Sequence, residues 1–88
     1  MGPIYVFDTY AKNAAGRILH FDVVLLEKDP DQALRCAREW LKSIGEDGAT
    51  VDARNCTYCH SETTVPPEMA DEIRTRGYAI YKLEGCPR

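Results

Sequence analysis

The stretch Asp29–Gly45, with the sequence DPDQALRCAREWLKSIG, contains the clearest structural signal in the chain. Asp29 can cap the start of a helix, Pro30 suits the first helical position, and Gln32 completes a capping-box pattern. Gly45 supplies the left-handed backbone that commonly ends a helix. Apolar residues recur at helical spacing on one side and charged residues occupy the other: Ala33, Leu34, Ala37, Trp40, Leu41 and Ile44 against Arg35, Arg38, Glu39 and Lys42. The stretch therefore predicts an amphipathic helix.

Two segments before this helix predict a β-hairpin. Ile4–Thr9 is rich in aromatic and β-branched residues, which is typical of a strand. Residues 12–16 provide the turn, because Asn13 and Gly16 tolerate left-handed backbone angles. Arg17–Glu27 forms a second strand, antiparallel to the first. Its odd positions make one unbroken apolar face: Leu19, Phe21, Val23 and Leu25.

After the first helix, the sequence predicts a strand, a helix and a last strand, at residues 49–55, 66–76 and 78–84. The chain 1–88 is thus expected to be a single α+β domain with the order β-β-α-β-α-β. Strand–helix–strand crossovers usually join parallel strands, so we expect the second, third and fourth strands to be parallel. This gives a mixed four-stranded sheet packed with two helices, which cover either one face or both.

Composition excludes several classes of partner. The formal net charge of −3 argues against binding to nucleic acid, which needs a clustered excess of Lys and Arg. No apolar run approaches the roughly 20 residues that span a bilayer, and the first residues do not have the pattern of a signal peptide. We therefore expect a cytoplasmic protein without a membrane partner. An uncovered sheet face would suit a homodimer or a protein partner.

The segment Cys56-Thr57-Tyr58-Cys59-His60 combines a C-x-x-C pair with a histidine. In the expected topology, Cys56 and Cys86 follow the carboxyl ends of two parallel strands, where ligands tend to bind. Cys59 would join them there. Structural zinc is usually held by four Cys and His ligands, and His60 is the candidate for the fourth. A zinc site formed by Cys56, Cys59, Cys86 and His60 is the first hypothesis.

Three other interpretations of the thiols remain. Cys56 and Cys59 would form a redox dithiol, although no helix begins at the pair to activate it. The cysteines would otherwise only fill volume, as expected for Cys36 beside the apolar stripe of the first helix, in a non-catalytic interaction module. C-x-x-C-H is also the attachment motif of c-type haem, but nothing else in the chain suggests an exported haem protein.

A second group of polar residues lies in the hairpin. If the strands pair residues whose numbers add up to about 28, then Asp8, His20 and Asp22 share one sheet face. A carboxylate can orient and charge-stabilise an imidazole, so this cluster can act as a general base. The simpler interpretation is a solvated face or a structural ion pair. The chain has no nucleophile-elbow serine and no phosphate-binding glycine loop, which favours a protein that is not an enzyme.

Five stretches of the chain resemble a small bacterial family catalogued as a domain of unknown function. They are Val6–Tyr10 (VFDTY), His20–Val23 (HFDV), Trp40–Gly45 (WLKSIG), Cys56–Ser61 (CTYCHS) and Gly77–Cys86 (GYAIYKLEGC). The resemblance implies a compact α+β cytosolic domain, and no reaction, substrate or cofactor follows from it. The family motif includes the C-x-x-C-H segment and the terminal Gly-Cys, which here is Gly85-Cys86.

Overall fold

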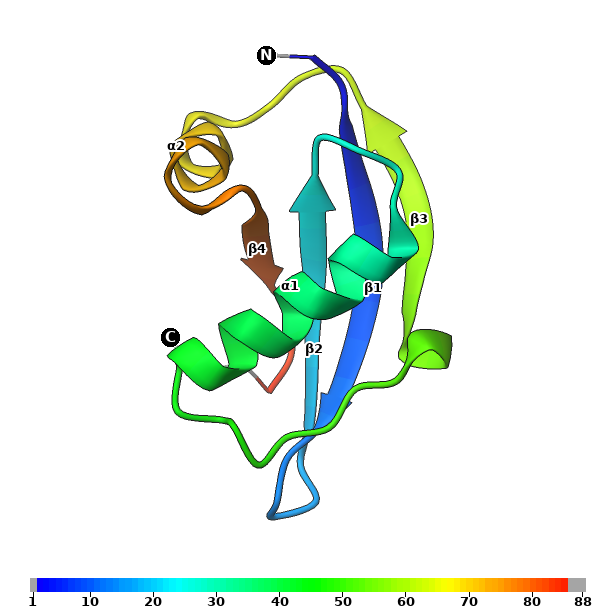
Figure 1. Cartoon of the computed structure of the whole chain (residues 1–88), viewed down its shortest axis with the longest axis vertical. Coiled ribbons are helices and arrows are strands. Elements are labelled where there is room, and N and C mark those ends of the chain that lie inside the picture. Colours follow the sequence, from blue (N-terminus) through cyan, green and yellow to red (C-terminus); the bar gives the residue numbers. More distant parts are fainter. Residues whose placement is uncertain (1, 86–88) are drawn as a thin grey trace.

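Four strands form one sheet, and two helices pack on it (Figure 1). The computed structural model describes residues 2–85. The elements are β1 (Ile4–Lys12), β2 (Ile18–Leu25), α1 (Pro30–Ser43), a short 3₁₀ helix η1 (Ala53–Asn55), β3 (Cys56–Glu62), α2 (Pro67–Arg76) and β4 (Ala79–Lys82). The predicted α+β class and the order β-β-α-β-α-β are confirmed.

The sheet order is β3-β1-β2-β4, and every neighbouring pair is antiparallel. The predicted hairpin is confirmed, whereas the predicted mixed sheet is wrong. The hairpin occupies the centre of the sheet, and β3 and β4 add to its two outer edges. In Figure 1, α2 lies at the end of the sheet where β3 finishes, so β4 starts from that same end and runs opposite to β3. The parallel arrangement expected for the second, third and fourth strands therefore fails at β4.

The hairpin register differs by two residues from the expected one. Asp8 pairs with Asp22, and Tyr10 pairs with His20. The cause is the loop after Lys12. The Asn13 Oδ1 accepts hydrogen bonds from the backbone N–H groups of Ala15 and Arg17, at 3.0 and 2.8 Å. This Asx turn moves the loop one position along the chain. A shift of two residues leaves each side chain on its predicted face.

The two helices cover opposite faces of the sheet. The larger apolar cluster joins the odd positions of the hairpin to α1, with Phe7, Phe21 and Trp40 at its centre. The Phe21 and Trp40 rings lie 4.6 Å apart between centroids. A smaller cluster on the other face joins Ile4, Val6 and Val24 of the strands to α2: its members also include Met69, Ile73 and Ala79. The core therefore has two parts, one on each side of the sheet.

The largest difference from the predicted elements concerns residues 49–55. Only Thr50 forms a β-bridge there, with Lys12, and η1 follows directly. Asp52 caps η1, because its Oδ1 accepts a hydrogen bond from the Arg54 backbone N–H at 2.9 Å. β3 therefore begins at Cys56, and the C-x-x-C-H segment lies inside a strand instead of following one. Among residues 2–85, no helix is long and apolar enough to cross a membrane.

Candidate functional site

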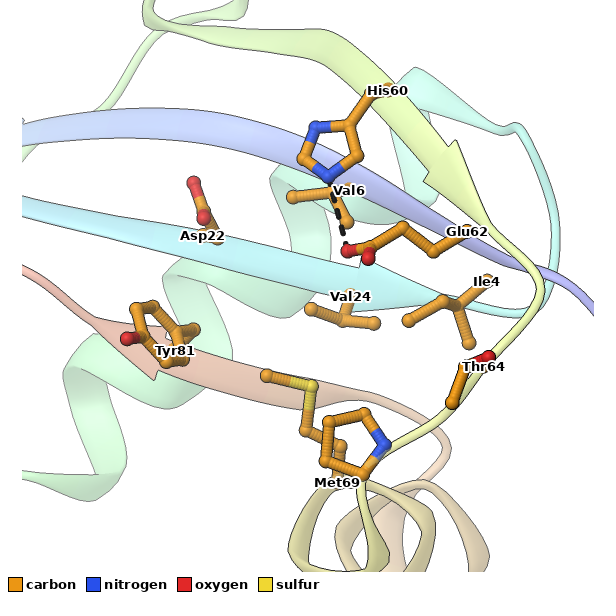
Figure 2. A pocket seen from close by; sticks show the side chains of 10 residues that line it. Ile4, Val6, Asp22, Val24, His60, Glu62, Thr64, Met69 and Tyr81 are labelled. Carbon is orange, nitrogen blue, oxygen red and sulfur yellow. Dashed lines mark hydrogen bonds and ion pairs between the residues drawn. The ribbon is translucent and has the colours of Figure 1, made fainter.

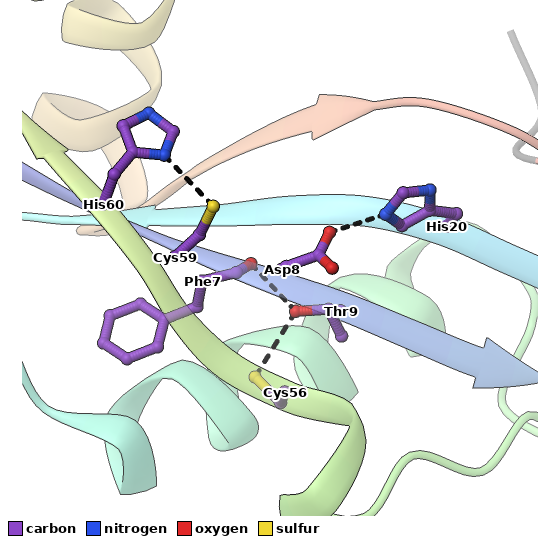
Figure 3. A network of polar contacts seen from close by, with 7 residues as sticks. All are labelled: Phe7, Asp8, Thr9, His20, Cys56, Cys59 and His60. Atoms are coloured by element: carbon purple, nitrogen blue, oxygen red, sulfur yellow. Dashed lines mark hydrogen bonds and ion pairs between the residues drawn. The ribbon is translucent and has the colours of Figure 1, made fainter.

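β3 places the two cysteines of the C-x-x-C pair on opposite faces of the sheet (Figure 3). Cys56 pairs with Thr9 and is buried in the cluster beneath α1. Cys59 is exposed and lies on the other face, beside His60. Because side chains alternate along a strand, residues three positions apart point in opposite directions. A spacing that would gather two thiols in a loop separates them here.

The Cys56 thiol is a core group. The Thr9 hydroxyl oxygen lies 3.3 Å from Cys56 Sγ and 3.1 Å from the carbonyl oxygen of Phe7. Burial raises the pKa of the Cys56 thiol, and the hydrogen bond with Thr9 lowers it. Burial likewise raises the pKa of Cys36, which packs in the same cluster as expected. Both thiols are therefore neutral packing groups.

A β-bulge turns Cys59 and His60 towards the same face. Val6 pairs with His60, whereas Phe7 pairs with Tyr58, so Cys59 is the extra residue on β3. The His60 Nδ1 lies 3.2 Å from Cys59 Sγ. Regular alternation would have pointed these two neighbours apart, and the bulge is what brings their side chains together.

This arrangement does not assemble the zinc site predicted from Cys56, Cys59, His60 and Cys86. Cys56 starts β3 and faces the core, away from Cys59 and His60, and Cys86 lies outside the described residues. The redox dithiol predicted from Cys56 and Cys59 is not formed either, because the two thiols lie on opposite faces of the sheet. Strand residues three apart have Cα atoms about 10 Å from each other, and a disulfide needs less than about 7 Å.

The structure does bring together Asp8, His20 and Asp22. The His20 Nε2 lies 2.6 Å from Asp8 Oδ1, and Asp22 is directly opposite Asp8 in the β1–β2 pair. One ligand-type atom from each of the three residues lies within 4.8 Å of the others. Figure 3 shows Asp8 and His20 on the side of the sheet that carries Cys59 and His60.

The three-residue cluster is partly buried and carries two neighbouring carboxyl groups. The side-chain exposure is 34% for Asp8 and 22% for His20. Tyr10 stacks on His20, with 4.1 Å between ring centroids. Burial raises the pKa of Asp22, the Asp8 carboxylate raises it further, and the imidazoles of His20 and His60 lower it. A positive charge placed here would relieve the repulsion between the two carboxylates.

A pocket of about 350 Å³ adjoins the three-residue cluster on the same face (Figure 2). Its floor is apolar and includes Ile4, Val6, Val24 and Met69, and its polar wall includes Asp22, His60, Glu62 and Tyr81. The His60 Nε2 lies 3.1 Å from Glu62 Oε2. The pocket therefore has an apolar base between β1, β2 and α2, and its ionisable groups come from both edges of the sheet, with His60 and Glu62 on β3 and Tyr81 on β4.

Sequence reasoning missed the role of Glu62 and the stacking of Tyr10. Glu62 follows His60 by two positions, which places both side chains on one face of a strand. That signal is hidden in the sequence, because the predicted elements leave residues 56–65 outside any strand. The bulge has no clear mark in the sequence, because Cys59 is neither a glycine nor flanked by one.

Comparisons with known proteins agree on the fold and the family. The family model "Domain of unknown function (DUF2024)" matches residues 3–83. The chain is 47% identical to protein NE1680 from Nitrosomonas europaea, a structural genomics target solved by NMR. The match covers 97% of this chain and 99% of that chain, with a TM-score of 0.83. No curated protein matches the chain. The family match spans nearly all of the described residues, and the chain therefore belongs to the DUF2024 family of domains of unknown function.

Proposed function

We propose that the protein binds a divalent cation, with zinc as the first candidate, at Asp8, His20 and Asp22. The observation that supports this proposal best is the close approach of three donor atoms, all within 4.8 Å of one another. Zinc accepts imidazole nitrogen and carboxylate oxygen at about 2.0–2.2 Å. Small rotations of the three side chains would bring their donor atoms to these distances.

Three protein ligands leave one position of a tetrahedral zinc for water or another ligand. This arrangement is typical of sites that exchange ligands, whereas structural zinc sites are closed by four protein groups. The pocket beside Asp22 provides room for such a ligand. We therefore propose a metal-dependent binding site on this face. The alternative of an interaction module that uses an uncovered sheet face stays a prediction.

The three cysteines among the described residues are all free. Free thiols suit a reducing compartment, so we propose that the protein acts in the cytoplasm. In that compartment Asp8, His20 and Asp22 would bind the metal. The thiols of Cys36 and Cys56 would stay reduced in the core.

The test is metal binding to protein purified without a metal-affinity tag and stripped with EDTA. Calorimetric titration with zinc chloride should give one site per chain and a higher melting temperature. Asp8→Asn and His20→Gln should abolish both effects. His60→Gln is the matched control, because it removes the other histidine of the same face and should leave zinc binding intact.

Cobalt provides a second measurement, because thiolate ligands give Co²⁺ an intense near-ultraviolet charge-transfer band that carboxylate and imidazole ligands do not. We expect a cobalt complex without that band. The proposal is wrong if stripped wild-type protein binds neither ion. It is also wrong if binding shows the thiolate band and is lost with Cys59→Ser but kept in His20→Gln.

A further inference from the structure

Cys59, His60 and Glu62 form a linear chain of polar contacts on the exposed edge strand β3. The Cys59 Sγ lies 3.2 Å from His60 Nδ1, and His60 Nε2 lies 3.1 Å from Glu62 Oε2. A nucleophile within hydrogen-bond reach of a base, with the base oriented by a third group, is the arrangement that activates side chains for covalent catalysis. None of the three residues belongs to the cluster proposed to bind metal.

We propose that Cys59 is a nucleophile for acyl transfer, with His60 as its general base and Glu62 as the residue that positions His60. The Glu62 carboxylate accepts a hydrogen bond from the Nε2–H of His60 and so favours the tautomer whose Nδ1 faces the thiol without a proton. Nδ1 can then accept the proton of the Cys59 S–H group. The two contacts together give each ring nitrogen of His60 a defined role.

The other thiols of the described residues are excluded from this chemistry by their surroundings. Cys36 and Cys56 are buried, with exposures of 8% and 3%, and burial raises the pKa of each. Cys59 is exposed on the outer edge of the sheet. A carbonyl group can therefore approach the sulfur of Cys59 from solvent, whereas no such path exists to the other two sulfurs.

The pocket beside His60 indicates the class of substrate. His60 and Glu62 form part of its wall, and its floor is made of aliphatic side chains such as Val6 and Met69 (Figure 2). An acyl group whose carbonyl lies over Cys59 can extend past the His60 ring and lay an apolar chain on this floor. The substrate class is thus an ester or thioester of a small apolar acid.

The reaction has two steps, acylation of Cys59 and hydrolysis of the resulting thioester. The Cys59 sulfur attacks the acyl carbon while its proton passes to His60 Nδ1, a sulfur–carbon bond forms, and the bond to the leaving group breaks. The leaving group takes the proton from Nδ1–H. Water then attacks the thioester on Cys59 and gives a proton to His60, the carboxylic acid leaves, and Cys59 regains its proton. No oxidant, reductant or metal takes part.

The test uses p-nitrophenyl acetate as the acyl donor, with EDTA present so that bound metal plays no part. Wild-type protein should release p-nitrophenol, and protein quenched with acid during turnover should carry an acetyl group that peptide mass mapping assigns to Cys59. Cys59→Ser should lose this acetylation, and His60→Gln should slow it by about 100-fold, the lower end of the range for general-base catalysis. Ser61→Ala is the matched control, since Ser61 is an exposed neighbour on β3, and it should keep the wild-type rate.

Two further readouts separate chemistry from folding. Because imidazole itself cleaves the ester, its effect is measured on the rate of Cys59 acetylation. Added imidazole should raise that rate by a larger factor in His60→Ala than in wild-type protein, which a merely structural role of His60 would not allow. Glu62→Gln should lower the rate less than His60→Gln and should alter its pH profile. That profile also depends on Asp22 from β2 and Tyr81 from β4, which line the pocket with His60, so both residues are kept in all variants. Circular dichroism should show an unchanged fold in every variant.

The substrate class is tested with p-nitrophenyl hexanoate, measured against acetate for the protein and for free cysteine. The protein should favour the longer chain more strongly than free cysteine does. An equal preference overturns the assignment of the pocket to the acyl chain. Acetylation at a residue other than Cys59, or an unchanged rate in His60→Gln, overturns the proposed nucleophile and base.

Discussion

The two faces of the sheet differ in composition, although the same strands form both. The face beneath α1 is one continuous apolar layer, formed by the odd positions of the hairpin and the buried stripe of the helix. The opposite face is apolar only at the end covered by α2, and it carries Asp8, His20 and Asp22 further along the strands. The first face holds the larger apolar cluster. The second holds the side chains that can bind a cation or take part in a reaction.

This difference can be traced to the strand periodicity of Ile18–Leu25. Its odd residues are all apolar, so the sheet face that they form can be covered completely by α1. Its even residues include His20 and Asp22 beside Val24, so the other face can be covered only in part. A short helix, α2, covers the apolar part and leaves the ionisable part partly exposed. The alternation along this one strand thus places the residues that stabilise the fold on one face and the proposed functional residues on the other.

The largest effect is expected from an aromatic residue on the α1 face. Phe21 is 0% exposed and packs on Trp40, so Phe21→Ala should lower the free energy of unfolding by about 3–5 kcal/mol. Tyr10→Ala is the comparison on the other face, where Tyr10 is 42% exposed, and should cost under about 1 kcal/mol. Urea unfolding followed by tryptophan fluorescence measures both. Similar losses for the two variants would contradict the unequal roles of the faces.

The C-x-x-C pair provides a second, closer comparison. Cys56→Ser places a hydroxyl in the core next to Thr9 and should destabilise the protein by about 1–2 kcal/mol. Cys59→Ser changes an exposed side chain and should stay within about 0.5 kcal/mol of wild type. Thermal and urea unfolding of the two single variants test this prediction. If the cysteines instead shared one site, the two substitutions would have comparable effects.

The smallest effect, opposite in sign, is expected at Asp22 in metal-free protein. Like charges that face each other across a strand pair are destabilising by roughly 0.2–1 kcal/mol, so Asp22→Asn should raise stability at neutral pH by about this amount. Because the pKa of Asp22 is raised in the folded state, protonation of this carboxyl group stabilises the folded protein. The contribution to the free energy of unfolding is fully present below the unfolded pKa. That contribution is lost as the pH rises through the folded pKa.

Unfolding titrations in EDTA from pH 4 to pH 8 would show this dependence for Asp22 and its absence in Asp22→Asn. The same variant should be less stabilised than wild type when zinc is added, because it has lost a proposed ligand. A variant that is destabilised in EDTA, or equally stabilised by zinc, would contradict the view that the two carboxylates are held together for a cation.

The parts of the fold that follow from local patterns could be predicted from the sequence, and the long-range pairing could not. The helix Pro30–Ser43 was indicated by its cap at Asp29 and its apolar stripe, and both are present. The order of strands in the sheet depends on which edge of the hairpin each later strand joins, and no local pattern encodes that choice. The crossover rule therefore led to an incorrect direction for β4.

The candidate site shows the same division. The alternation of side chains in the hairpin predicts that Asp8, His20 and Asp22 share one face. The register shift of two residues does not change that face. The grouping of Cys56 with Cys59 depended on the segment being a loop, and it failed because β3 extends through residues 56–62. The contact between Cys59 and His60 depends on a bulge, which is set by pairing with β1 and has no local signature.

The bulge has a further consequence for how copies of this protein behave in concentrated solution. β3 is an edge strand, and its outer hydrogen-bonding groups could act as a template for a strand of another chain. An extra residue bends the strand and breaks the regular spacing of those groups, which makes the edge a poor template. The single residue that sets a thiol beside an imidazole therefore also lowers the tendency of this edge to seed aggregation.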